Sequence, residues 1–163
     1  METPASGLDA RGYLAGWLMG QKDMFVKDLK AVPADKLTIS PGGVARPVNE
    51  ITADAISLGK WCANALRGNV DSSYEEGSMA ALAASLTTHE ALIAAVSESM
   101  DDLAAAIAHA SDETFNTMVT PPWQMPAPMY ILTLIAVNHY WYHDGQINYF
   151  QALNGDGAVH WMD

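Results

Sequence analysis

Two histidines and a glutamine recur at helical spacing near the carboxyl end of the chain. The run "NHYWYHDGQINYF", residues 138–150, places His139, His143 and Gln146 four and then three residues apart. On an α-helix these spacings put the three side chains on one face, so a ligand or a neighbouring helix at that face contacts all three. Two imidazoles one turn apart are suited to hold one transition-metal ion at about 2.0–2.2 Å from each nitrogen.

A third metal ligand has to come from another part of the chain, because two protein ligands alone seldom hold an ion. Asp54 lies in a second helical pattern, three residues after Ile51 and four before Leu58, on an apolar stripe. A carboxylate on such a stripe is costly without a partner. With the two histidines it would form a set with open coordination positions, suited to Zn²⁺, Ni²⁺, Fe²⁺ or Mn²⁺. The alternative is that Asp54 borders the stripe and is solvated.

Residues beside the histidine pair have several expected roles. Gln146 would hydrogen-bond a bound water, a substrate or a backbone carbonyl, or else fix the helix. Asp144 is rotated by about 100° around the helix relative to His143. We therefore expect it either to hydrogen-bond to a metal ligand or to lie on the surface. Tyr142 and Tyr149 are expected in the core with a hydroxyl at the rim, the alternative being the mouth of a pocket. Tyr140 follows His139, so the glutamate of the zinc-protease motif His-Glu-x-x-His is missing.

Four long segments with helical periodicity would position these residues. They cover about residues 8–32, 47–68, 88–110 and 127–153, with breaks rich in proline and glycine between them and no strand-like alternation. We therefore predict an all-α fold, a four-helix bundle with a long crossover connection, in a single domain over residues 1–163. The last helix is expected to bury one stripe that includes the two histidines and Leu132, Ile135, Gln146, Phe150 and Leu153.

The composition restricts the partners. The chain has 19 acidic against 8 basic residues and a formal charge of -11, which disfavours nucleic acid and anionic membrane surfaces as partners. No stretch approaches the roughly 18 apolar residues of a membrane span, and the start "METPASGLDARG" lacks a signal-peptide pattern. The single cysteine, Cys62, excludes an internal disulfide and is predicted to be a core thiol rather than a nucleophile. We expect a cytoplasmic protein.

Two segments together, "ITADAISLGKWCANALRG" (51–68) and "NHYWYHDGQINYFQALNGDGAVHW" (138–161), resemble the DinB-like (DinB/YfiT) superfamily. The resemblance spans the whole chain, and its most specific part is His139-x-x-x-His143-Asp144-Gly145-Gln146. It implies a four-helix bundle, often dimeric, in which three histidines bind a divalent metal, one from the second helix and a pair from the fourth. Here His139 and His143 match the pair, whereas Asp54 stands at the first-ligand position. That departure changes the charge of the site by one unit and leaves open whether this chain binds metal.

Three functions follow for testing. The resemblance implies a metal-dependent enzyme, either a thiol transferase with a low-molecular-weight thiol or a hydrolase of a small molecule, with a homodimer as the expected assembly. The second hypothesis is a non-catalytic bundle whose metal site is a buried Asp–His network, with a carboxylate about 2.7–3.0 Å from an imidazole nitrogen. The third is a small-ligand binder that uses aromatic side chains, without a motif behind it; these are Trp17, Trp61, Trp123 and Tyr142.

Overall fold

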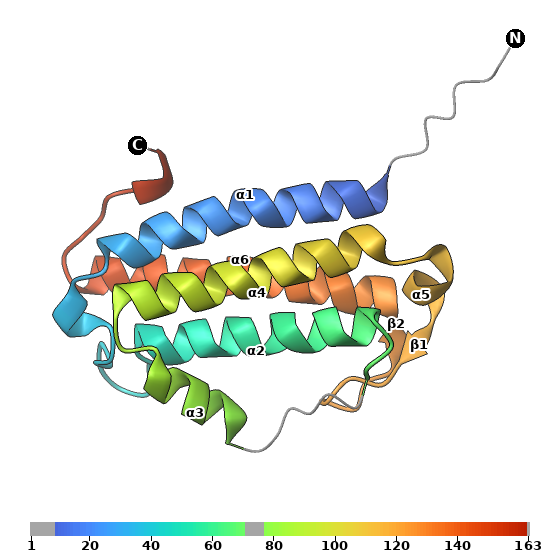
Figure 1. The fold of residues 1–163 in the computed structure, drawn as a ribbon. Helices are drawn as coiled ribbons and strands as arrows, with labels where there is room; N and C mark the ends of the chain where they lie inside the picture. The colour runs from blue at the N-terminus through green and yellow to red at the C-terminus, as the bar shows by residue number, and fades with distance from the viewer. Residues whose placement is uncertain (1–8, 71–76, 163) are drawn as a thin grey trace, which may run out of the picture.

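The computed structural model describes residues 9–70 and 77–162, most of which are helical (Figure 1). The four long helices are α1 (Ala10–Ala31), α2 (Val48–Leu66), α4 (His89–His109) and α6 (Met129–Leu153). The shorter helical elements are η1 (Ala34–Lys36), α3 (Ser78–Ser85), α5 (Asp112–Asn116) and η2 (His160–Met162). Two strands of two residues each, β1 (Met118–Val119) and β2 (Ala127–Pro128), pair antiparallel. The prediction of an all-α protein is confirmed.

Local sequence signals explain where the long helices begin. The Thr88 hydroxyl accepts a hydrogen bond from the Ala91 backbone N–H at 3.2 Å and caps α4. Proline stands at the N-cap of both α2 and α6, at Pro47 and Pro128. The first backbone N–H groups of a helix have no partner within the helix, so proline, which has no N–H, costs nothing there. Leu8, the predicted start of the first helix, lies outside the described residues, as do residues 71–76 of the acidic linker.

The long helices pack side by side and enclose one hydrophobic core. α1 contacts α4 and α6, and α2 contacts the same two helices from the other side. Figure 1 shows that α1 and α6 run in one direction and α2 and α4 in the other. Because α2 and α4 are parallel, the chain between them has to return along the molecule, and α3 lies on that return path. Within the described ranges, no helix is both long and apolar enough to cross a lipid bilayer.

The short elements are absent from the sequence prediction, namely α3, α5, the β1–β2 pair and the turns η1 and η2. Each is shorter than the window over which periodicity separates a helix from a loop. α5 and the strands lie within the 18-residue break at residues 111–128. In that break Trp123 packs against Trp61 of α2, with ring centroids 5.7 Å apart. The contact holds the break against the end of α2.

The buried face of α6 differs from the predicted stripe. Ile135 and Leu153, expected to be buried, are 41% and 54% exposed. Leu132, His143 and Phe150 of that stripe are buried as predicted, and the other buried residues beside them include Ala136, Tyr140 and Ile147. This rotation of the helix leaves His139 and Gln146 at the edge of the core, because α6 packs against both α1 and α2 rather than against one partner.

Candidate metal centre

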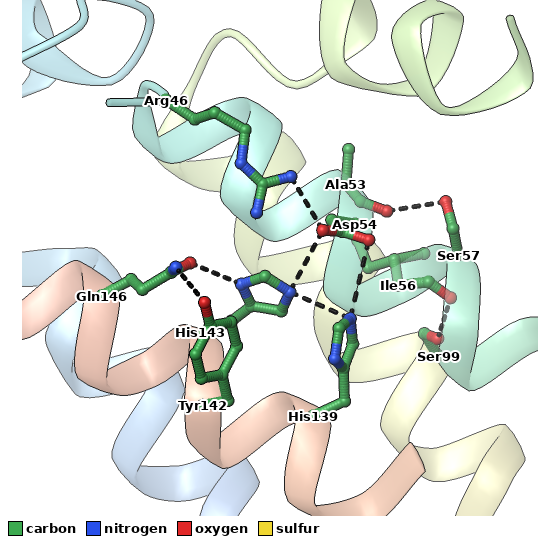
Figure 2. A network of polar contacts seen from close by, with 10 residues as sticks. All are labelled: Arg46, Ala53, Asp54, Ile56, Ser57, Ser99, His139, Tyr142, His143 and Gln146. Carbon is green, nitrogen blue, oxygen red and sulfur yellow. Dashed lines mark hydrogen bonds and ion pairs between the residues drawn. The ribbon is translucent and has the colours of Figure 1, made fainter. Parts of the chain in front are cut away.

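The three residues predicted as metal ligands meet between two adjacent helices (Figure 2). Asp54 comes from α2, and His139 and His143 come from successive turns of α6. One ligand atom from each residue lies within 4.8 Å of the other two. The His143 side chain is fully buried, whereas those of His139 and Asp54 are 24% and 20% exposed. The cluster is therefore anchored in the core and open to solvent on one side.

The distances within the cluster are close to the separations between the ligands of one metal ion, and the shortest is also a hydrogen bond between the two imidazoles. The Nε2 atoms of His139 and His143 are 2.9 Å apart. Asp54 Oδ1 lies 3.6 Å from His139 Nε2, and Asp54 Oδ2 lies 3.4 Å from His143 Nε2. Ligands about 2.0–2.1 Å from a tetrahedral ion are separated from one another by about 3.3 Å. The carboxylate is too far from both imidazoles for the short charged hydrogen bond that an Asp–His network requires.

Gln146 determines which nitrogen of His143 faces the cluster. His143 Nδ1 donates a hydrogen bond to Gln146 Oε1 at 2.7 Å, and Gln146 Nε2 donates to the Tyr142 hydroxyl at 3.0 Å. With the proton on Nδ1, the Nε2 lone pair of His143 points toward Asp54 and His139, as metal coordination requires. Orientation of an imidazole was not among the roles predicted for Gln146.

The prediction that Tyr142 and Tyr149 pack in the core is wrong. Their side chains are 59% and 67% exposed, because both lie on the outward side of α6. They line a groove of about 450 Å³ between α6 and the loop before α2. We call it the Arg46 groove; its lining residues are Pro41, Val44, Ala45, Arg46, Ile51, Tyr142, Gly145, Gln146, Tyr149, Phe150 and Leu153. Tyr142 therefore lies at a pocket, which was the alternative to core packing.

Arg46 is a member of the site that sequence reasoning missed. Its Nη1 atom donates to Asp54 Oδ2 at 2.7 Å from the loop that precedes α2 (Figure 2). The imidazoles of His139 and His143, together with Arg46, hold the pKa of the Asp54 carboxyl far below its usual range, against the opposing effect of partial burial. Arg46 lies eight positions before Asp54 but in the loop outside α2, where helical spacing rules do not apply, so periodicity carried no signal for this contact.

Asp144 does not support the metal ligands and is not on the surface. It is 5% exposed and faces Asp28 of α1, which is fully buried. Asn148 Nδ2 donates to Asp28 Oδ2 at 2.9 Å, whereas Oδ1 of each aspartate has no hydrogen-bond partner among the described residues. Burial and the neighbouring Asp28 raise the pKa of Asp144 to about 8, and burial raises the pKa of Asp28. A proton shared by the two carboxyl groups gives the unpartnered oxygens a partner.

Asp28 could have been found from the sequence. It lies on the same apolar stripe of the first helix as Phe25 and Leu29, both of which are fully buried. The reasoning that singled out Asp54, a carboxylate on an apolar stripe, applies equally to Asp28.

Cys62 lies in the core, and the tryptophans of the proposed aromatic site lie in two separate pairs. Cys62 is fully buried, and burial raises the pKa of its thiol to about 12, which confirms a core thiol and removes the thiolate a nucleophile needs. Trp17 packs beside Trp141 at 6.3 Å between centroids, whereas Trp61 packs with Trp123. Among residues 9–70 and 77–162 no ring contact joins these two pairs, whereas Tyr142 lines the Arg46 groove, so the aromatic ligand site stays a prediction.

No family model matches the chain, and a search of curated proteins finds no significant relative. The functional proposal therefore depends on the geometry of the site.

Proposed function

We propose that this chain is a divalent-metal-binding protein of the DinB-like four-helix-bundle type, in which Asp54, His139 and His143 hold the ion. The observation that carries the proposal is the convergence of the two imidazoles and the carboxylate: the Nε2 atoms are 2.9 Å apart, and each lies 3.4 or 3.6 Å from one oxygen of Asp54. The Gln146 bond to His143 Nδ1 supports it, because it leaves the other nitrogen free to coordinate.

The reaction class we propose is metal-dependent thiol transfer or hydrolysis of a small molecule. A bound Zn²⁺, Ni²⁺, Fe²⁺ or Mn²⁺ with open coordination positions supplies a Lewis acid that lowers the pKa of water or of a thiol. The residues of this chain hold the site in place: Arg46 offsets the charge of Asp54, and Gln146 orients His143. The exposed edges of His139 and Asp54 leave the solvent side accessible to a substrate.

The first test is metal content. Protein purified without a histidine tag and incubated with each of the four ions is expected to retain about one ion per chain by elemental analysis. His143→Ala should weaken the affinity by at least about 100-fold, because one of three ligands is lost. His109→Ala, which removes an exposed histidine at the end of α4, is the matched control and should bind like the wild type. Wild-type protein that stays metal-free would overturn the proposal.

Gln146→Ala is expected to weaken zinc binding about 10-fold to 100-fold, the usual cost of losing a hydrogen bond that orients a ligating imidazole. Gln146→Glu keeps an oxygen that can accept from His143 Nδ1 and should retain most of the affinity. Competition titration against a chromophoric chelator measures both variants. Equal affinities for the alanine variant and the wild type would show that the hydrogen bond does not position His143.

A second candidate function is a non-catalytic bundle with a metal-free Asp–His–Arg cluster. The ion pair between Arg46 and Asp54 favours it, because this contact satisfies the carboxylate without a metal. The elemental analysis separates the two: absence of metal after incubation with all four ions supports the second candidate.

We also propose that the protein forms a homodimer through the outer face of α6. Tyr130, Leu134 and Trp141 are 45%, 44% and 43% exposed on this helix, and its single Asp or Glu, Asp144, is buried. Two copies that each carry a charge of -11 repel one another, so an uncharged face is where they can approach. Sedimentation equilibrium should give the dimer mass for the wild type and the monomer mass for Trp141→Glu. A wild-type monomer at millimolar concentration would contradict this assembly.

A further inference from the structure

The Arg46 groove opens beside the proposed metal centre and has an unusual charge for this protein. Arg46, Tyr142 and Gln146 belong both to the groove and to the hydrogen-bonded cluster around Asp54. Arg46 is the one charged side chain among its lining residues, although the chain as a whole carries 19 acidic residues. The rest of the lining is mainly apolar and aromatic, including Val44, Tyr149, Phe150 and Leu153.

The guanidinium of Arg46 retains donors for a ligand. Its recorded contact is from Nη1 to Asp54, and Nη2 and Nε have no partner recorded in the part of the chain that the structure describes. An arginine presents five N–H donors in a planar fork that matches a carboxylate. Arg46 from the loop before α2 and Tyr142 and Gln146 from α6 all approach the cluster (Figure 2), and all three line the groove.

The size of the groove is that of a small-molecule site. Its volume of about 450 Å³ lies in the range of roughly 300–1,000 Å³ that such sites occupy. The apolar lining favours a hydrocarbon or aromatic body, and the guanidinium donors that Arg46 does not use toward Asp54 favour a carboxylate head group.

We propose that the Arg46 groove binds a small amphipathic carboxylate, with its carboxylate at Arg46 and its apolar body against Tyr149, Phe150 and Leu153. Any reaction of the bound molecule depends on the proposed metal function, since its head group would lie next to the metal ligands. It names the substrate class of that site: an anionic molecule with an apolar tail. Binding itself requires Arg46 and the groove, so it is measurable with and without metal.

The test is calorimetric titration of the full-length protein with octanoate and with octanamide, its uncharged isostere. Each titration is made on zinc-loaded protein and on protein treated with a chelator. Octanoate should bind saturably and at least tenfold more tightly than octanamide, since a hydrogen bond to a charged group contributes about that factor or more. Butanoate should bind at least tenfold more weakly than octanoate, because each buried methylene contributes up to about fourfold.

Two variants locate the ligand. Gly145→Leu should abolish octanoate binding, because Gly145 lines the groove and an added Cβ there meets no atom within 4 Å, so the leucine can be accommodated and occupy the groove. Gly20→Leu makes the same change at an open position of α1 outside the groove and should leave binding unchanged. Arg46→Gln should reduce octanoate affinity to that of octanamide while octanamide affinity stays the same.

The outcomes separate this inference from the metal proposal. Zinc binding without octanoate binding overturns the inference and leaves the proposed function in place. Octanoate binding that Gly145→Leu abolishes and Arg46→Gln weakens supports the inference, even in protein that takes up no metal. Equal affinities for octanoate and octanamide, or binding that survives in Gly145→Leu, would overturn the assignment of the groove to a carboxylate.

Discussion

Asp144→Asn is expected to make the protein about 3 kcal/mol more stable to unfolding at pH 8, and less so at pH 5. The pKa of Asp144 is raised in the folded protein to about 8, from about 3.9 in an unfolded chain. Between these values folding takes up a proton, so wild-type stability falls as the pH rises, by up to about 1.4 kcal/mol per pH unit. An asparagine is neutral throughout this range and can donate to the unpartnered Asp28 Oδ1.

Urea unfolding in a chelating buffer from pH 5 to pH 8 measures this effect without interference from metal. The wild type should lose stability across the range, on the order of 4 kcal/mol at most, and the variant should show a flatter profile. Asp23→Asn makes the same charge change on the exposed side of α1 and serves as the control. Parallel profiles for Asp144→Asn and the wild type would mean that the two buried carboxyl groups do not share a proton.

Gly59→Ala is expected to destabilise the fold by about 3 kcal/mol, at the upper end of the cost of overpacking a core. A Cβ at this position of α2 would collide with the Tyr140 hydroxyl and lie 2.7 Å from Tyr140 Cζ. Tyr140 is fully buried and is held on its other side by a hydrogen bond to the Ser99 hydroxyl at 2.7 Å. The ring therefore has little room to move away.

The control for this change is Gly20→Ala in α1, where an added Cβ meets nothing within 4 Å. There the substitution should stabilise the protein by about 0.5–1 kcal/mol, because alanine is the better helix former. Adding Tyr140→Phe to Gly59→Ala should recover part of the lost stability by removing the colliding hydroxyl. If the two glycine variants unfold at the same urea concentration, the contact between α2 and α6 is looser than described.

The four long helices were predictable because their signals are local. Apolar residues at helical spacing, the Thr88 cap and the prolines before α2 and α6 all act within a few residues of one another. The helices α3 and α5 were not predicted, since eight and five residues give too short a pattern. They are formed where the packing of the long helices requires the chain to turn.

The sequence by itself determined two features of the candidate site. The four-residue spacing of His139 and His143 places both on one helical face whatever the fold, and the apolar stripe around Asp54 turns that carboxylate inward. Only the tertiary structure decided which groups surround them. The rotation of α6 buried Asp144 against Asp28, and the loop before α2 brought Arg46 within 2.7 Å of Asp54. The first contact depends on how α1 and α6 pack together, and the second on the path of the loop that precedes α2, and periodicity along one helix carries no information about either.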